Sequence, residues 1–158
     1  MKKTIFYMLL AMLPLAWGCG SDDDDTVDPD QPKNPELTLG NAVRPGWIDP
    51  DYFTFELTMS VQFRLQDFFD EYVSDKDLLC AMVNDEVRAV TAPEYSEGGI
   101  YFPLVIAANS SDNMVSIAYY CDKLQRIFTI DSWHQFDTSL PPLDNGQPYL
   151  LEFITTEQ

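Results

Sequence analysis

The sequence predicts one all-β domain, folded as an antiparallel β-sandwich with room for one short helix. The first observation is the segment of residues 52–65, in which apolar and polar residues alternate strictly from Phe53 to Leu65. Successive side chains of a strand point to opposite faces, so this segment predicts a long strand with one apolar face. The second is a series of some seven or eight short strand-like runs, separated by turn residues about every ten positions. Both patterns are typical of an immunoglobulin-like or jelly-roll-like sandwich, and a barrel is the second choice.

The N-terminal segment has the composition of an export signal and is therefore excluded from the fold. Lys2 and Lys3 are followed by an apolar stretch, residues 5–17, interrupted only by Pro14. A helix that spans a membrane needs about 20 apolar residues, so this stretch is too short. It predicts a signal peptide over residues 1–18.

The expected cleavage region, Leu15-Ala16-Trp17-Gly18-Cys19, resembles a lipobox. In a lipobox the cysteine is lipidated and becomes the new N-terminus, so the resemblance implies an acylated Cys19. Ala16 stands where leucine is usual, and Trp17 is bulkier than the usual residue. An ordinary signal peptide with an incidental cysteine is the alternative.

An acidic run follows the cysteine directly. It consists of Ser21, Asp22, Asp23, Asp24 and Asp25. It resembles the export tag that lipoproteins of Bacteroidota carry behind the lipidated cysteine. The resemblance implies a lipid anchor in the outer membrane, with the protein facing the cell exterior.

Residues 19–36 are rich in proline and charge, and they lack the aliphatic residues that a core requires. They predict an extended tether, which leaves residues 37–158 as the sandwich domain. The whole chain carries a net charge of −17. Nucleic acid is therefore excluded as a partner, because phosphate binding requires a basic surface. Contact with the membrane is expected through the acyl chains alone.

The first half of the domain contains two ambiguous segments beside the long strand. Residues 37–39 are expected to open the sheet, and residues 40–51 form a loop because prolines and glycine interrupt them. Residues 66–77 have the apolar spacing of a short amphipathic helix, although a loop that caps the open end of the sandwich fits equally well.

The second half divides more cleanly into strands. The apolar run 78–83 predicts a strand buried on both faces, followed by a hairpin turn and a returning strand over residues 87–92. A loop is expected over residues 93–99, and further strands at residues 100–108, 114–121, 126–130 with 133–136 as a continuation, and 149–154. Pro103 lacks an amide hydrogen, so an edge or a bulge is expected at its position. Glu86 and Arg88 share one face of their strand and predict a surface ion pair worth under ~1 kcal/mol.

Several of these runs together resemble small β-sandwich modules of secreted proteins and surface lipoproteins of Bacteroidota. The resemblance rests on Trp47, on the strand that contains Met59 and Val61, and on the runs 79–90 and 100–105. The modules have a tryptophan, then a strand with the pattern Met-polar-Val, and then the pattern Ala-Phe-Val-x-x-Glu-x-Arg-Gly. Here Met82 replaces the phenylalanine and Ala89 the glycine. The resemblance implies a sandwich and no specific activity.

Catalytic and metal-binding patterns are weak in this sequence. His134 is the only histidine, and no Gly-x-Ser-x-Gly motif accompanies it. Carboxylates are so abundant that no pair of them stands out as an acid and a nucleophile. Acidic residues crowd 67–77 and flank Pro50, but they lack the spacing of a calcium-binding loop. We therefore assign no catalytic residue, no metal and no cofactor.

Cys80 and Cys121 both fall in predicted strands. An exported protein can bridge such a pair when the strands are neighbours. Free thiols that act as small apolar residues are the favoured alternative, because both cysteines lie in apolar runs.

The aromatic residues are the best candidates for ligand binding, since aromatic rings are enriched at contact sites. We single out Trp133, Trp47, His134 and Tyr149. The sequence therefore predicts a non-enzymatic, lipid-anchored surface protein that binds an extracellular glycan or protein. A structural or assembly subunit of an outer-membrane surface complex is the alternative, and a small hydrolase is a weaker one.

Overall fold

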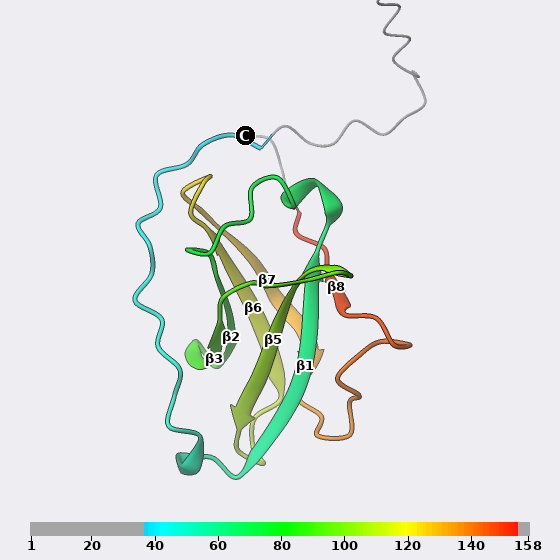
Figure 1. Ribbon diagram of the computed structural model, residues 1–158. Coiled ribbons are helices and arrows are strands. Elements are labelled where there is room, and N and C mark those ends of the chain that lie inside the picture. The colour runs from blue at the N-terminus through cyan, green and yellow to red at the C-terminus, as the bar shows by residue number, and fades with distance from the viewer. Residues whose placement is uncertain (1–36, 155–158) are drawn as a thin grey trace, which may run out of the picture. The chain divides into compact units, whose positions relative to one another are not determined.

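Residues 37–154 are described by the computed structural model, and they fold into two packed β-sheets (Figure 1). The strands are β1 (Leu57–Leu65), β2 (Leu78–Val83), β3 (Glu86–Thr91), β4 (Glu94–Ser96), β5 (Gly99–Ala108), β6 (Met114–Cys121), β7 (Arg126–Gln135) and β8 (Tyr149–Leu151). Two short 3-10 helices, η1 (Tyr52–Thr54) and η2 (Asp67–Phe69), flank β1. The predicted β-sandwich is confirmed.

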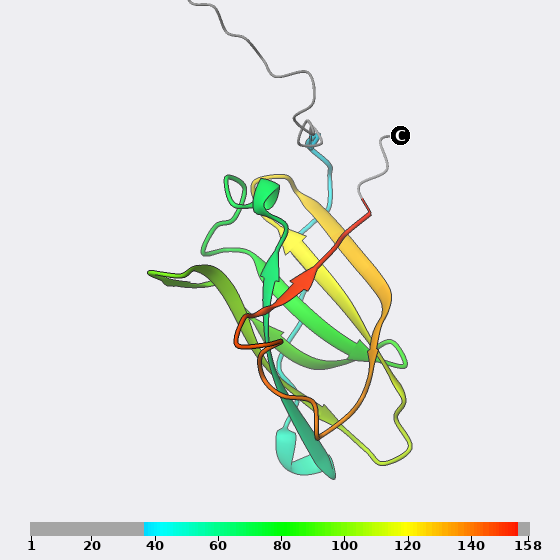
Figure 2. The same cartoon turned by 90° about the vertical axis from the view of Figure 1, so that its right-hand side faces the viewer.

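The front sheet has the strand order β4-β5-β1-β8, and the back sheet has the order β3-β2-β6-β7. All pairs are antiparallel except β1 and β8, which run parallel over Phe63–Leu65 and Tyr149–Leu151. The connection between β7 and β8 carries the chain from the back sheet to the front sheet (Figure 2).

Strand β1 is shorter than the alternation predicts. Its inward residues, among them Met59, Val61 and Phe63, are buried as expected. Phe53, by contrast, is 98% exposed. The carboxylate of Asp51 accepts a hydrogen bond from the Phe53 amide at 3.1 Å and caps η1, so the chain turns before the strand begins. A local cap therefore overrides an alternating pattern at this end.

Aromatic rings fill the core between the sheets. Phe69 lies edge-on to Phe128 at 4.9 Å and to Tyr119 at 5.7 Å, and Phe153 stacks on Tyr119 at 6.0 Å. Such pairs contribute about 0.5–1.5 kcal/mol each beyond the area that they bury. Phe69 comes from η2, so the segment between β1 and β2 closes one end of the sandwich with a 3-10 turn and loop instead of a longer amphipathic helix.

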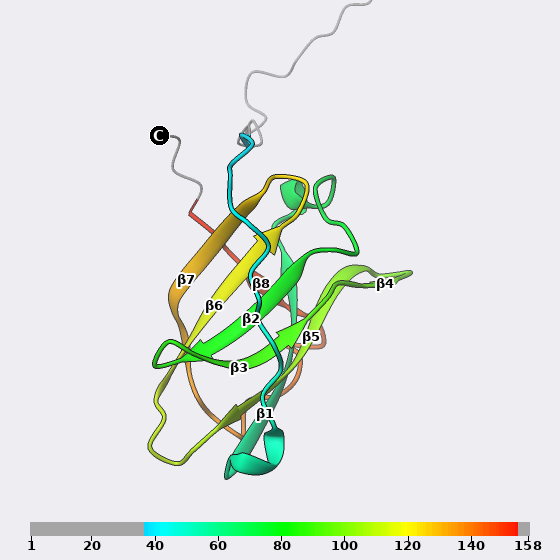
Figure 3. The same cartoon turned by 90° about the vertical axis from the view of Figure 1, so that its left-hand side faces the viewer.

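Residues 37–51, which we call the strap, cross the outer face of the back sheet without forming a strand, and residues 37–39 do not open a sheet as expected. Figure 3 shows the strap in cyan over β6, β2 and β3. The amides of Gly40 and Ala42 donate to the carbonyls of Leu124 and Gln125, each at 2.7 Å. Because of this cover, Cys80 on β2 is fully buried outside the main core cluster.

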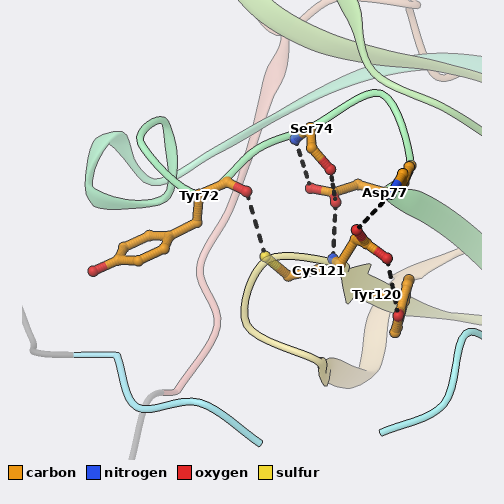
Figure 4. A network of polar contacts seen from close by, with 7 residues as sticks. Tyr72, Ser74, Asp77, Tyr120 and Cys121 are labelled. Atoms are coloured by element: carbon orange, nitrogen blue, oxygen red, sulfur yellow. Dashed lines mark hydrogen bonds and ion pairs between the residues drawn. The ribbon is translucent and has the colours of Figure 1, made fainter.

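Asp77 is a fully buried carboxylate that ties this end of the sandwich together. Its Oδ1 accepts from the Ser74 hydroxyl at 2.8 Å and from the Asp122 amide at 2.9 Å, and its Oδ2 accepts from the Tyr119 hydroxyl at 2.6 Å. Figure 4 shows Asp77 beside Ser74 and Cys121. Burial is the main reason why the pKa of Tyr119 is raised, so this tyrosine remains a donor.

Arg88 is buried, which corrects the expected surface ion pair. Its Nη2 lies 3.1 Å from Glu86 and 3.3 Å from Asp112, whose side chain is also buried. The guanidinium packs over the Phe55 ring at 4.6 Å, which adds a cation–π contact. The pair was visible in the sequence, but the contacts that bury Arg88 come from distant segments.

The remaining predictions on the second half are largely confirmed. Strand β2 is buried on both faces, and Asn84 and Asp85 form its turn with φ angles of 54° and 62°. The loop expected before β5 contains the short strand β4. Strand β4 pairs with β5 only as far as Tyr101, so Pro103 has a hydrogen-bonded neighbour strand on the β1 side alone. The expected edge position of this proline is confirmed.

The sandwich belongs to a compact unit of residues Asn34–Gln158. In the part of the chain that the structure describes, no helix has the length and apolar character to cross a membrane. The expected signal peptide (1–18), the lipidated Cys19, the acidic tag and the tether up to residue 36 lie outside the described residues, as do residues 155–158.

Candidate binding groove

The outer face of the front sheet is polar along β1. Ser60, Gln62 and Arg64 point away from the core, because they alternate with the buried residues of the same strand. In the register between β1 and β5, Ser60 lies opposite Val105 and Gln62 lies opposite Pro103. These residues form the floor of a groove.

Two adjoining hollows make up this groove. The larger, of about 570 Å³, is lined by Asp49, Tyr52, Ser60, Val61, Gln62, Val90, Thr91, Glu94, Pro103, Leu104, Val105 and Pro142. The smaller, of about 290 Å³, is lined by Gln62, Arg64, Ser96, Gly98, Gly99, Ile100, Tyr101, Leu143, Gly146, Gln147 and Pro148. Gln62 lines both hollows. Ligand sites typically measure about 300–1,000 Å³, so the two hollows together, which we call the binding groove, have room for an extended small ligand.

One wall of the binding groove is an aromatic–carboxylate pair at the end of the strap. The Tyr52 hydroxyl donates to Asp49 Oδ1 at 3.0 Å, and the Val90 amide of β3 donates to the same oxygen at 2.6 Å. Burial, followed by the hydrogen bond and the charge of Asp49, raises the pKa of Tyr52 to about 12. The tyrosine is therefore a fixed, protonated donor to Asp49 at neutral pH.

The β4–β5 hairpin repeats this arrangement. Glu94 and Tyr101 are directly opposite each other in the register, and the Tyr101 hydroxyl donates to Glu94 Oε2 at 2.9 Å. This hydrogen bond is the main reason why the pKa of Tyr101 is raised. The fold therefore places one tyrosine in the lining of each hollow, with its hydroxyl bound to a carboxylate.

The loop between β7 and β8 closes the third side. The Gln62 amide of β1 donates to the Pro142 carbonyl at 2.9 Å, and the Tyr149 hydroxyl donates to the Pro141 carbonyl at 3.0 Å. Asn145 and Gly146 both have positive φ angles, 49° and 83°, and form the turn that the sequence Asn-Gly favours. Among the residues that the structure describes, Arg64 is the one cation that lines either hollow, and its Nη1 lies 3.4 Å from Asp67 Oδ1.

The aromatic candidates from the sequence lie elsewhere. Trp133 is half-buried on β7, with its ring edge-on to Phe63 at 4.7 Å and to Tyr149 at 5.8 Å. Tyr149 is also half-buried and reaches the groove only through the backbone that its hydroxyl supports. Trp47 is half-buried within the strap. The structure therefore brings Trp133 together with Tyr149 and with His134, but it half-buries the Trp133 and Tyr149 rings.

His134 is exposed on β7, and its Nδ1 lies 2.6 Å from the carbonyl of its neighbour Gln135. It contacts the Trp133 ring at 5.4 Å and lines neither hollow. Within residues 37–154 no three side chains of the His, Cys, Asp or Glu type gather at metal-binding distance.

Comparisons with protein-family models, with curated proteins and with solved structures found no match to this chain.

Cys80 and Cys121 are both free and buried. Cys121 belongs to the core between the sheets, whereas Cys80 lies under the strap, so the two thiols face different layers. Burial, with a smaller contribution from Asp49, raises the pKa of Cys80 to about 12. Burial also raises the pKa of Cys121. Both thiols are therefore protonated and unreactive at neutral pH.

The sequence contained only a partial signal for the groove. The polar side of the alternating strand over residues 58–64 was visible, and Tyr52 stands three residues after Asp49. Glu94 and Tyr101, however, are brought together only by the register of a short hairpin that had been expected to be a loop.

Proposed function

We propose that the protein is a non-enzymatic, lipid-anchored module of the cell surface that binds an extracellular glycan in the binding groove. The observation that carries this proposal is the pair of tyrosines, one lining each hollow, whose hydroxyls are held by carboxylates beside a floor of strand side chains. Sugar rings offer apolar faces that stack on aromatic rings and hydroxyls that bind to amide and carboxylate oxygens. The groove supplies both kinds of group side by side.

The anchor in this proposal is the acylated Cys19, followed by the acidic tag that directs the protein to the outer face of the outer membrane. The tether then separates the lipid from the sandwich. With nearly 20 residues between Cys19 and the strap, the domain would stand clear of the lipid surface, because an extended chain spans about 3.3 Å per residue.

A glycan array probed with the exported chain, carrying Cys19→Ala to keep it off the membrane, tests the proposal. Tyr52→Ala and Tyr101→Ala should each weaken binding about fivefold or more, if a sugar ring gains from an aromatic side chain the roughly 1–3 kcal/mol that a stacked nucleobase does. Tyr95→Ala is the matched control, because Tyr95 is an exposed tyrosine of the same hairpin that lines neither hollow. Binding that no groove variant reduces would refute the proposal.

A protein partner, as in the alternative of an assembly subunit, is favoured by a separate observation. The strap and η1 expose the apolar side chains of Leu39, Val43, Ile48 and Phe53. Exposed aromatic and aliphatic residues in one segment often mark a protein contact. If this alternative holds, Phe53→Ser should abolish co-purification of a surface partner, while Tyr101→Ala should leave it unchanged.

A further inference from the structure

The larger hollow of the binding groove presents an excess of hydrogen-bond acceptors. Asp49 and Glu94 are the charged residues in its lining, and no lysine, arginine or histidine of the described chain joins them there. In the smaller hollow, Arg64 is the single cation within residues 37–154, and it is already paired with Asp67 at 3.4 Å. An anionic ligand would therefore meet two carboxylates without compensation.

Each of the two carboxylates has one oxygen left for a ligand. Asp49 uses Oδ1 for both Tyr52 and the Val90 amide, and Glu94 uses Oε2 for Tyr101. The other oxygens, Asp49 Oδ2 and Glu94 Oε1, receive no hydrogen bond from any residue between 37 and 154. Because both tyrosine hydroxyls donate their hydrogen to a carboxylate, they too can act only as acceptors toward a ligand.

A ligand that matches this surface must be rich in donors. An ammonium group carries three N–H donors and a positive charge, and its hydrogen bonds to carboxylates are about twice as strong as neutral ones. We propose that the binding groove selects an oligosaccharide with free amino groups over neutral, uronate-bearing or sulfated ones. This inference rests on the proposed glycan-binding function and specifies the ligand class.

An oligosaccharide is favoured over a basic peptide by the shape and composition of the same site. Two tyrosines, one lining each hollow, and a floor of β1 and β5 side chains offer surfaces that suit the faces of sugar rings. The overall charge of residues 37–158, with 19 acidic and six basic side chains, would attract any cation from a distance. Selectivity must therefore be measured at about 0.15 M salt, where charges more than about 8 Å apart are largely screened.

The test compares three hexasaccharides by calorimetry against the exported chain carrying Cys19→Ala. They are a β-1,4-linked glucosamine oligomer, its fully N-acetylated counterpart and an oligogalacturonate of equal length. We expect the amino oligomer to bind at least about tenfold more tightly than the acetylated one, and the galacturonate not to bind. Glu94→Gln and Asp49→Asn should each remove about tenfold of affinity for the amino oligomer only, corresponding to about 1.4 kcal/mol.

Glu97→Gln is the matched control, since Glu97 is an exposed acid of the same hairpin that lines neither hollow. Equal affinity for the amino and the acetylated oligomer would overturn this inference while leaving glycan binding intact. If Glu97→Gln weakened binding as much as Glu94→Gln, the effect would come from the overall negative charge, and the inference would be overturned as well. An equally tight complex with hexalysine, lost in the same variants, would replace the oligosaccharide by a peptide. Failure of every oligosaccharide would refute the proposed function itself.

Discussion

Docking of the strap depends on a glycine that leaves no room for a side chain. A Cβ atom at Gly40 would lie 2.5 Å from Arg126 Cγ and 2.6 Å from the Gln125 carbonyl oxygen. The arginine can move, but the carbonyl belongs to the backbone and accepts the hydrogen bond from the Ala42 amide. Gly40→Ala should therefore push the start of the strap away from the turn before β7.

The cost follows from the contacts that would be lost. The two backbone hydrogen bonds of Gly40 and Ala42 to the Leu124 and Gln125 carbonyls are each worth about 0.5–1.5 kcal/mol. Their loss, together with the crowding, should make undocking of the strap easier by about 2 kcal/mol. A change of this size increases the population of the undocked state about 30-fold, since every 1.4 kcal/mol is a factor of ten.

Cys80 reports on this opening because it lies fully buried beneath the strap, while Cys121 lies between the sheets. In chains carrying Cys19→Ala and a single remaining thiol, the rate of labelling by a thiol reagent measures how often each site opens. We expect Cys80 to be labelled about 30-fold faster in Gly40→Ala, in proportion to the larger population of the undocked state. Labelling of Cys121, which requires the sheets to separate, should change far less.

Gly46→Ala is the matched control within the same strap, because a Cβ at this position meets no atom within 4 Å. It should leave the labelling of both thiols unchanged. The reasoning would be refuted if Gly40→Ala labelled Cys80 no faster than Gly46→Ala did. Equal acceleration at Cys80 and Cys121 would also contradict it, because that result would indicate global unfolding instead of release of the strap.

Three further substitutions test the scaffold by urea unfolding. Asp77→Asn replaces one acceptor oxygen by a donor that faces other donors, so it should lower the free energy of unfolding by about 3 kcal/mol. Asp131→Asn, at an exposed site, is the control and should change it by less than about 0.5 kcal/mol. Trp133→Ala should lower the free energy of unfolding by about 2–3 kcal/mol, because its packing on Phe63 is lost, and it should leave glycan affinity unchanged. A large loss of affinity would instead place the ligand site on β7. Arg88→Met should cost about 3 kcal/mol by leaving a buried carboxylate unpaired, and Glu86→Gln, whose carboxylate is 72% exposed, under about 1 kcal/mol.

The fold was predictable from the sequence because periodicity and turn residues act locally. The strand β6, at Met114–Cys121, lies where the pattern placed it, and so does the doubly buried β2. The failure at Phe53 has a local cause as well, since an aspartate cap formed a turn inside an alternating run. The strap buries the outer side of β2, and because the strap has no regular structure, no sequence pattern indicates this cover.

The groove could not be predicted in the same way, because its walls depend on register. Trp133 was the more prominent candidate in the sequence. The sequence pattern, however, is the same for an aromatic side chain that packs on Phe63 and for one that faces a ligand. Tyr101 and Glu94 become partners only through β4, a strand of three residues. The two residues are only seven positions apart, but their contact requires a hairpin register in a segment that was expected to be a loop.

The strap links the scaffold to the binding groove, because it both covers the back sheet and supplies one wall of the groove. Its first anchor is at Gly40, and its last is the 2.6 Å hydrogen bond from the Val90 amide to Asp49. Since the last anchor survives in Gly40→Ala, that variant should weaken glycan binding less than Tyr52→Ala does, although it frees Cys80. Asp49→Asn keeps an acceptor oxygen for the Val90 amide but removes the charge, so it should have the opposite profile, with strong loss of ligand and little labelling of Cys80. If both variants had the same effect on ligand and thiol, the strap would act as one rigid unit, and separate anchoring at its two ends would be ruled out.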